Sequence, residues 1–218
     1  MSPTTKLHSL VFSVATASVL LLWNCISNFY ATHWLICFIA SFVVSSAFYK
    51  YLYNIAATIC KEVTCLKKWA LGQYYFEGLW IGFYTINGEK EYYYEIFEQS
   101  LEELSIKGMA FDSQDKPVET WSILHPHIDI SASKFTYYYE LSDFSSPDIT
   151  LGYSCATIYW NKHHNAYKLL GFAVDNYFEG KQSYTSIKVD PGKYKGHQQD
   201  WINSCFFAEV HKLETELM

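Results

Sequence analysis

A run of 43 residues without Asp, Glu, Lys or Arg, residues 7–49, constrains this chain more than any other feature. A helix that crosses the hydrocarbon core of a membrane needs about 20 predominantly apolar residues. The run is therefore long enough for two crossings and a turn. We expect transmembrane helices at residues 7–24 and 34–53, joined by the short polar segment "CISNFYATH". The sequence thus predicts a two-helix transmembrane hairpin within residues 1–53.

Lysines flank this run on both outer sides and are missing from the connecting segment. Lys6 precedes the first span, and four lysines lie at or beyond the end of the second: Lys50, Lys61, Lys67 and Lys68. Basic residues concentrate in cytoplasmic flanks. We therefore expect a multi-pass membrane protein with both termini and the β-rich domain in the cytoplasm. A signal peptide at residues 1–30 is the alternative, but no small-residue cleavage site separates the two apolar stretches.

Both expected spans carry small residues four positions apart, Ser13/Ala17 and Ser41/Ser45. This spacing lets transmembrane helices approach closely, which suits packing within the membrane or self-association. Apolar residues then recur at helical spacing from Leu52 to Ala70. We expect a linker helix within residues 54–75, which either joins copies of the protein or packs on its own domain.

The hydrophobic period changes to two from Gly78 onward, which indicates strands. Eight are expected, at residues 79–86, 90–98, 103–111, 118–124, 134–141, 150–160, 167–175 and 183–190. Short turns such as Asn87-Gly88 separate them and leave no room for helices between, so the pairing is antiparallel. Residues 76–218 therefore predict a lipocalin-like, eight-stranded antiparallel up-and-down β-barrel. An amphipathic C-terminal helix is expected from Asp200.

The segment Gly78-Leu79-Trp80 matches the Gly-x-Trp with which lipocalins open, where the tryptophan closes the barrel floor. On this basis Trp80, Gly82 and Tyr84 point inward, and the Asn87-Gly88 turn lies at the open rim. A barrel of eight strands has room for its own side chains or for one small ligand.

Two N-terminal spans, a short linker and one β-rich domain resemble the CD-NTase-associated protein 15 family of CBASS effectors. These are also described as SMODS-associated two-transmembrane, β-strand-rich effectors. The segments that carry the resemblance are, in chain order, "EGLWIGFYTI", "GMAF", "ETWSI", "FTYYYEL" and "GFAVDNYFEGKQSYTSIKVD". The resemblance implies antiphage defence by abortive infection. It also implies that a partner CD-NTase nucleotidyltransferase makes a cyclic dinucleotide and that the barrel binds it. Self-association of the spans would then rupture the bacterial inner (cytoplasmic) membrane, in which the protein would lie.

Aromatic residues make up 19% of the chain, and aromatic rings are good platforms for flat bases. The electrostatics are less suited to a dianion, because residues 76–218 are acidic and the chain contains no arginine. We expect the ligand-binding residues among strand positions near the rim, with a lysine as phosphate partner. The candidates are Tyr84, Tyr92, Trp121, Tyr139, Tyr153, Asp175 and Lys188.

Two other functions remain open. "HPHID" places His125, His127 and Asp129 at alternating positions, as metal ligands on one strand face can be. A metal-dependent hydrolase would use such a site, but no catalytic motif accompanies it. We therefore expect a binding protein without a cofactor rather than an enzyme. The remaining alternative is a membrane-anchored lipid carrier, for which an aromatic barrel interior would provide an apolar cavity.

Overall fold

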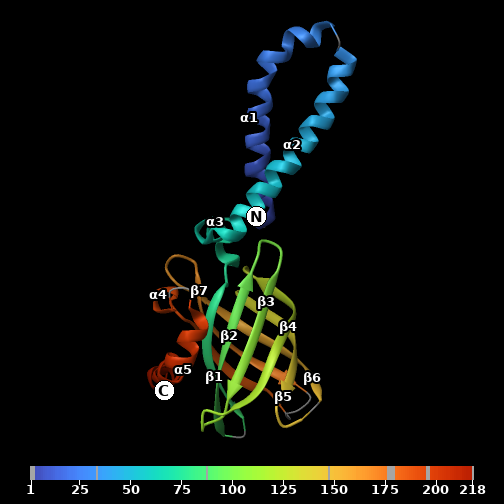
Figure 1. Cartoon of the computed structure of the whole chain (residues 1–218). Helices are drawn as coiled ribbons and strands as arrows, with labels where there is room; N and C mark the ends of the chain where they lie inside the picture. The colour runs from blue at the N-terminus through green and yellow to red at the C-terminus, as the bar shows by residue number, and fades with distance from the viewer. Residues whose placement is uncertain are drawn as a thin grey trace. The chain divides into compact units, whose positions relative to one another are not determined.

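The computed structural model describes residues 3–32, 34–86, 88–146, 148–175, 180–194 and 197–217. It divides into two compact units (Figure 1). One unit comprises residues 1–72 with 100–102 and is helical. The other comprises residues 73–99 and 103–218 and contains all eight strands.

The helical unit is a hairpin of two long helices, α1 (Pro3–Thr32) and α2 (Trp34–Glu62). Leu7 and Val11 of α1 are buried against Cys60 and its neighbours on α2. His8 stacks on the ring of Tyr53 at a centroid distance of 4.5 Å. Its Nδ1 lies 2.5 Å from the hydroxyl oxygen of Tyr49. These contacts hold the start of α1 against the second half of α2.

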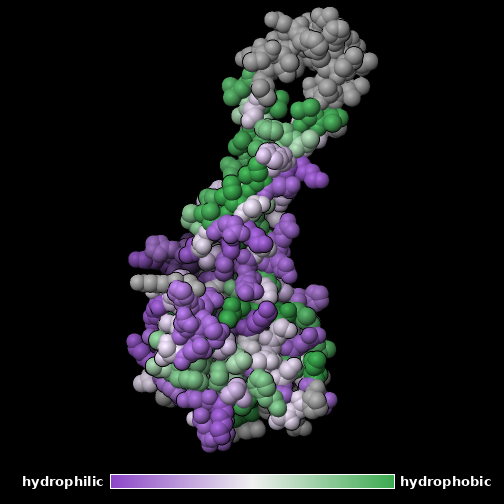
Figure 2. Space-filling view, in the orientation of Figure 1, coloured by the Kyte–Doolittle hydropathy of each residue, from purple (hydrophilic) through white to green (hydrophobic). Residues whose placement is uncertain are grey.

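The hairpin exposes large apolar side chains on its described surface (Figure 2). Phe12 and Leu20 are each 65% exposed, and Leu21 is 75% exposed. Within the described residues, one helix is long and apolar enough to cross a membrane, with its best stretch at Thr4–Leu21. A signal sequence near an N-terminus has the same length and apolar composition. The second expected span, residues 34–53, is helical, and its membrane crossing stays a prediction.

The expected linker helix is interrupted. α2 ends at Glu62, and a separate short helix, α3 (Thr64–Leu71), follows. Val63 between them is extended, with φ −100° and ψ 101°. Val63 and Thr64 are both β-branched, and such residues favour extended backbone over helix. The apolar stripe from Leu52 to Ala70 is therefore divided between two helices, and a 3₁₀ turn, η1 (Gly72–Tyr74), ends it.

The eight expected strands are all present and close into one antiparallel barrel in which each strand pairs with its neighbours in the chain. They are β1 (Gly78–Ile86), β2 (Glu89–Gln99), β3 (Leu104–Phe111), β4 (Pro117–Asp129), β5 (Lys134–Asp143), β6 (Ile149–Trp160), β7 (Ala166–Asp175) and β8 (Gln182–Lys188). Pairing of β1 with β8 closes the barrel. Asn87 of the expected hairpin turn lies outside the described residues.

Alternation along β1 sends Trp80, Gly82 and Tyr84 inward, as the sequence predicted. Trp80 and Tyr84 belong to the buried interior cluster. Leu79 and Ile81 face the other way and pack in a second cluster outside the barrel. A strand with both faces buried has few positions free for polar residues, which explains why β1 is apolar almost throughout.

Aromatic rings fill the barrel at the end where Trp80 lies. Trp80 and Phe76 are completely buried, and their ring centroids are 6.0 Å apart. The indole N–H of Trp80 donates to the carbonyl oxygen of Phe76 at 3.0 Å. Phe135 packs on the same ring of Phe76 at 5.5 Å. This end of the barrel is therefore solid.

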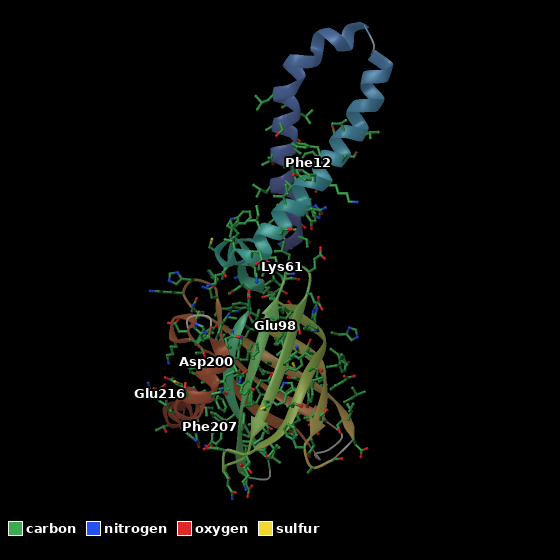
Figure 3. All side chains as sticks on the ribbon, viewed as in Figure 1. Phe12, Lys61, Glu98, Asp200, Phe207 and Glu216 are labelled. Carbon is green, nitrogen blue, oxygen red and sulfur yellow. The ribbon has the colours of Figure 1, made fainter. Side chains whose placement is uncertain are left out.

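The C-terminal helix α5 (Gln198–Leu217) begins two residues before the expected Asp200 and packs against the outside of the barrel. A short helix, α4 (Pro191–Tyr194), precedes it. Figure 3 shows Asp200, Phe207 and Glu216 spread along α5. Its buried residues recur at helical spacing and cover the outer faces of β1–β3: Trp201, Ile202, Phe206, Val210 and Leu213.

Candidate functional site

A cavity lies inside the barrel at the end opposite Trp80. Its lining comes from six of the eight strands: Tyr84, Tyr93, Glu95, Glu119, Trp121, Tyr137, Tyr139, Leu141, Ala173, Asp175, Gln182 and Tyr184. Its volume is about 50 Å³. A buried water needs about 10–15 Å³ by this measure, so the cavity has room for roughly three to five water molecules.

Glycines make space for three of the aromatic rings that line the cavity. Gly108 is the direct cross-strand partner of Trp121, and a Cβ at Gly108 would lie 2.1 Å from the indole. Gly152 has the same relation to Tyr139, with a Cβ-to-ring distance of 2.2 Å. Gly82 pairs with Tyr93, whose ring a Cβ would approach to 2.7 Å. Each ring thus lies across the backbone of the neighbouring strand, which is possible only where that strand has no side chain.

One carboxyl group deep in the cavity is held by two donors. The indole N–H of Trp121 donates to Oε1 of Glu95 at 3.1 Å, and the hydroxyl of Tyr137 donates to the same oxygen at 3.4 Å. Glu95 is 2% exposed. Burial raises its pKa to about 7, although both hydrogen bonds act in the opposite direction because they favour the ionised form.

Two further carboxyl groups, those of Glu119 and Glu91, contact the hydroxyl of the same tyrosine, Tyr84. The hydroxyl oxygen of Tyr84 lies 2.5 Å from Oε1 of Glu119 and 2.8 Å from Oε2 of Glu91. Burial raises the pKa of Glu119 to about 7, and the charges of Glu91, Asp175 and Asp143 add to this effect. Burial also raises the pKa of Glu91. Carboxyl groups that resist ionisation are thus concentrated around the hydroxyl of Tyr84.

The structure brings four of the seven predicted site residues together. Tyr84, Trp121, Tyr139 and Asp175 all line the cavity. The hydroxyl of Tyr139 donates to Oδ2 of Asp175 at 3.2 Å, which joins two of the predicted residues directly.

The other three predicted residues lie elsewhere. Tyr92 faces outward beneath α5, where its hydroxyl donates to Glu214 at 2.8 Å. Tyr153 also faces outward and packs on Tyr138 at 5.4 Å. Lys188 lies beside Trp80 at the solid end, with its Nζ 5.6 Å from the centre of that ring. Side chains alternate along a strand, so an error of one residue in phase moves a side chain to the opposite face.

Sequence reasoning missed most of the polar lining, namely Tyr93, Glu95, Glu119, Tyr137, Gln182 and Tyr184. A usable signal was present in the Asn87-Gly88 turn. A two-residue turn between Ile86 and Glu89 pairs Gly82 with Tyr93, and cross-strand partners share a face. Since Gly82 was expected to face inward, Tyr93 follows, and Glu95 follows two residues later.

The polar character of the cavity restricts what it can bind. Among the described lining residues there are three carboxyl groups and no lysine. Aromatic rings stack on flat or cationic groups. Carboxyl oxygens accept hydrogen bonds, so the interior suits a flat group with N–H or O–H donors. It does not suit a phosphate or a fatty-acid carboxylate.

The histidine motif does not form the face that the sequence predicted. His125 has a positive φ of 51°, and the register of β4 shifts between Leu124 and His127. This irregularity breaks the alternation that would have set His125 and His127 side by side. Within the described part of the chain, no group of three or more His, Cys, Asp or Glu side chains could hold a metal ion.

No protein-family model matches the chain, and no curated protein matches it in sequence. The candidate site therefore rests on its own geometry, a small cavity of aromatic rings and buried carboxyl groups within a closed barrel.

Proposed function

We propose that this chain is a membrane-anchored sensor of a cyclic dinucleotide and acts as an antiphage (CBASS) effector. The barrel binds the messenger that a CD-NTase nucleotidyltransferase makes. Binding promotes self-association of the transmembrane hairpins, disruption of the inner membrane and abortive infection. In this proposal the barrel and both termini lie in the cytoplasm.

The observation that carries the proposal is the aromatic cavity inside a barrel that shares a chain with an apolar hairpin. Six of the lining residues are aromatic: Tyr84, Tyr93, Trp121, Tyr137, Tyr139 and Tyr184. Stacking of a base on one such ring contributes about 1–3 kcal/mol. Phe12, Leu20 and Leu21 leave the hairpin with exposed apolar surface that a bilayer would cover.

The phosphates of the ligand remain outside the acidic interior. Lys116 precedes β4 and Lys181 precedes β8, and both are exposed. In an up-and-down barrel these two connections lie at the same end as the cavity. A base enters the cavity edge first and the phosphates stay at the mouth beside these lysines. A cavity of about 50 Å³ is too small for a whole dinucleotide, so deeper entry of the ligand requires the lining rings to move.

The proposed response follows from linkage. A ligand shifts an assembly equilibrium only if it binds the assembled state more tightly than the separate one. A shift from 1:99 to 99:1 requires about a 10⁴-fold difference in affinity. Lipid transport is less well supported as an alternative, because Glu95, Glu119 and Asp175 place carboxyl groups where a fatty-acid anion would lie.

Binding is tested on the full-length protein in detergent by titration with cyclic dinucleotides, using Trp121 fluorescence and calorimetry. Tyr139→Phe removes a hydroxyl inside the cavity, and Tyr153→Phe makes the same change on the outer surface as a matched control. We expect weaker binding only for the first variant. Failure of every cyclic dinucleotide to bind the wild-type protein would reject the proposed function.

Topology is tested separately in cells. Reporter fusions after Met218 should indicate the cytoplasm, and a reporter in the segment between the two expected spans should indicate the periplasm. A periplasmic C-terminus would be incompatible with a cytoplasmic messenger.

A further inference from the structure

The hydrogen-bond donors of the cavity lining determine what a ligand must itself donate or accept. Tyr84 has one hydroxyl proton, yet its oxygen lies within hydrogen-bond distance of both Glu119 and Glu91. The hydroxyl of Tyr84 donates toward these two carboxyl groups and is therefore already engaged within the barrel.

The remaining donors of the lining are mostly used within the barrel. Trp121 and Tyr137 donate to Glu95, and Tyr139 donates to Asp175. The hydroxyl of Tyr184 forms a hydrogen bond of 2.8 Å with Ser154. A ligand in this cavity consequently meets few free protein donors and must bring its own.

Three polar atoms of the lining have no hydrogen-bond partner among the residues that the structure describes. All hydrogen bonds of Glu95 and Glu119 within the described part of the chain go to their Oε1 atoms, which leaves both Oε2 atoms as acceptors for a ligand. Gln182 Nε2 is buried and has no hydrogen-bond partner among the described residues. A buried donor or acceptor without a partner is costly, so such atoms in a cavity indicate where a ligand or water binds.

We propose that the cavity recognises the Watson–Crick edge of a guanine base. This inference rests on the proposed function and specifies which base the messenger carries. Guanine presents two adjacent donors, N1–H and N2–H, and one acceptor, O6. The two carboxyl oxygens of Glu95 and Glu119 accept from the donors, and the amide of Gln182 donates to O6. The three edge atoms replace the roughly three to five water molecules for which the cavity has room.

The other bases complement this set less well. Adenine presents one donor beside an acceptor on the same edge, so one carboxyl oxygen would remain desolvated and would face a ring nitrogen. Uracil presents one donor between two acceptors, which would face the carboxyl groups. Leaving a buried acceptor without a hydrogen-bond donor weakens binding by about tenfold or more. An organic cation would also find acceptors here, but it would have no use for the amide donor of Gln182.

The experiment compares ligands on the wild-type full-length protein in detergent, so it does not depend on the folding of a variant. The ligands are cyclic di-GMP, cyclic GMP–AMP, cyclic di-AMP, cyclic di-UMP and cyclic di-IMP, with spermidine as the cationic probe. We expect the two guanine-containing ligands that carry N2 to bind at least tenfold more tightly than cyclic di-AMP and cyclic di-UMP. Cyclic di-IMP lacks the N2 amino group and should bind more weakly than cyclic di-GMP.

Each outcome has a distinct meaning. Equal or tighter binding of cyclic di-AMP or cyclic di-UMP would overturn the guanine assignment and leave the proposed function in place. Binding of spermidine with no dinucleotide binding would overturn both. A second measurement uses Glu95→Gln, with Glu140→Gln on the exposed outer surface as the matched control. Glu95→Gln replaces one carboxyl oxygen with an NH2 group, which cannot accept a hydrogen bond. It should reduce the preference for cyclic di-GMP over cyclic di-AMP at least tenfold, whereas Glu140→Gln should preserve this preference.

Discussion

The indole ring of Trp121 occupies the space that a side chain at Gly108 would need, because the two residues are direct cross-strand partners on β3 and β4. Gly108→Ala places a methyl group 2.1 Å from the ring, so the ring or the strand must move. Overpacking of this kind costs about 1–3 kcal/mol. We expect the unfolding midpoint to fall and the tryptophan fluorescence to change. Gly192→Ala, whose new Cβ would lie 3.3 Å from the end of the exposed Asp190 side chain, is the control and should be nearly neutral.

The buried carboxyl groups of Glu95 and Glu119 should make the folded protein less stable as the pH rises. Most acidic residues have the opposite effect, because folding usually lowers their pKa. Glu95 and Glu119 have pKa values of about 7 in the folded protein, against 4.5 for a free glutamate. A raised pKa means that the folded state holds protons which the unfolded state loses above pH 4.5. Their contribution to stability is therefore fully present below pH 4.5 and is lost as the pH rises to about 7.

The size of this effect follows from the same shift. At about 1.36 kcal/mol per pKa unit, each group costs roughly 3 kcal/mol at pH 8 relative to pH 4.5. The nearby acids Glu91, Asp143 and Asp175 share the site and increase the effect on Glu119. Urea unfolding at pH 5 and pH 8 measures it. Glu119→Gln should flatten the pH dependence between these values, and Glu140→Gln should not; a wild-type protein that is more stable at pH 8 would contradict the prediction.

Substitutions of Tyr92 and Tyr139 should have different effects, the first on the stability of the fold and the second on ligand binding. Tyr92→Phe removes the hydrogen bond to Glu214 on α5 and should reduce the free energy of unfolding by about 1 kcal/mol. It should leave ligand affinity unchanged, because Tyr92 lies outside the barrel. Tyr139→Phe should weaken binding instead. If Tyr92→Phe alone reduced affinity, the ligand site would lie beneath α5 rather than in the cavity.

Much of the barrel was predictable because strand alternation and turn chemistry are local. The inward direction of Trp80 and Tyr84 followed from a short motif at the start of β1. Tyr92 was misplaced because all three residues of "YYY" have the same propensity, and only the register with Gly82 distinguishes them. Lys188 was chosen for its charge, whereas its position depends on pairing with Trp80 from the far end of the domain. The break at Val63 lacked the Gly or Pro that usually marks a helix end.

The proposed coupling between ligand binding and membrane disruption is tested on the hairpin. Ser13 and Ala17 are exposed on α1, so this small-residue face is available to another copy. The side chain of Ser41, in the corresponding pair on α2, lies outside the described residues. We expect Ala17→Leu with Ser45→Leu to preserve membrane insertion and ligand binding, because both new side chains are apolar.

The same double variant should reduce ligand-dependent crosslinking and dye release from proteoliposomes, because leucine prevents close helix approach. Val19→Leu, at an exposed and already apolar position, is the control. Unchanged leakage in the double variant would mean that other surfaces carry the assembly.

Because β1 pairs with β8, every strand of the barrel has a hydrogen-bonded neighbour on both sides. Two copies therefore cannot join by strand addition, the route through which open sheets extend into fibrils. Any association of barrels must use side-chain contacts instead. Such contacts can form and separate without opening the sheet, so an assembly built on them would be reversible when the ligand is withdrawn.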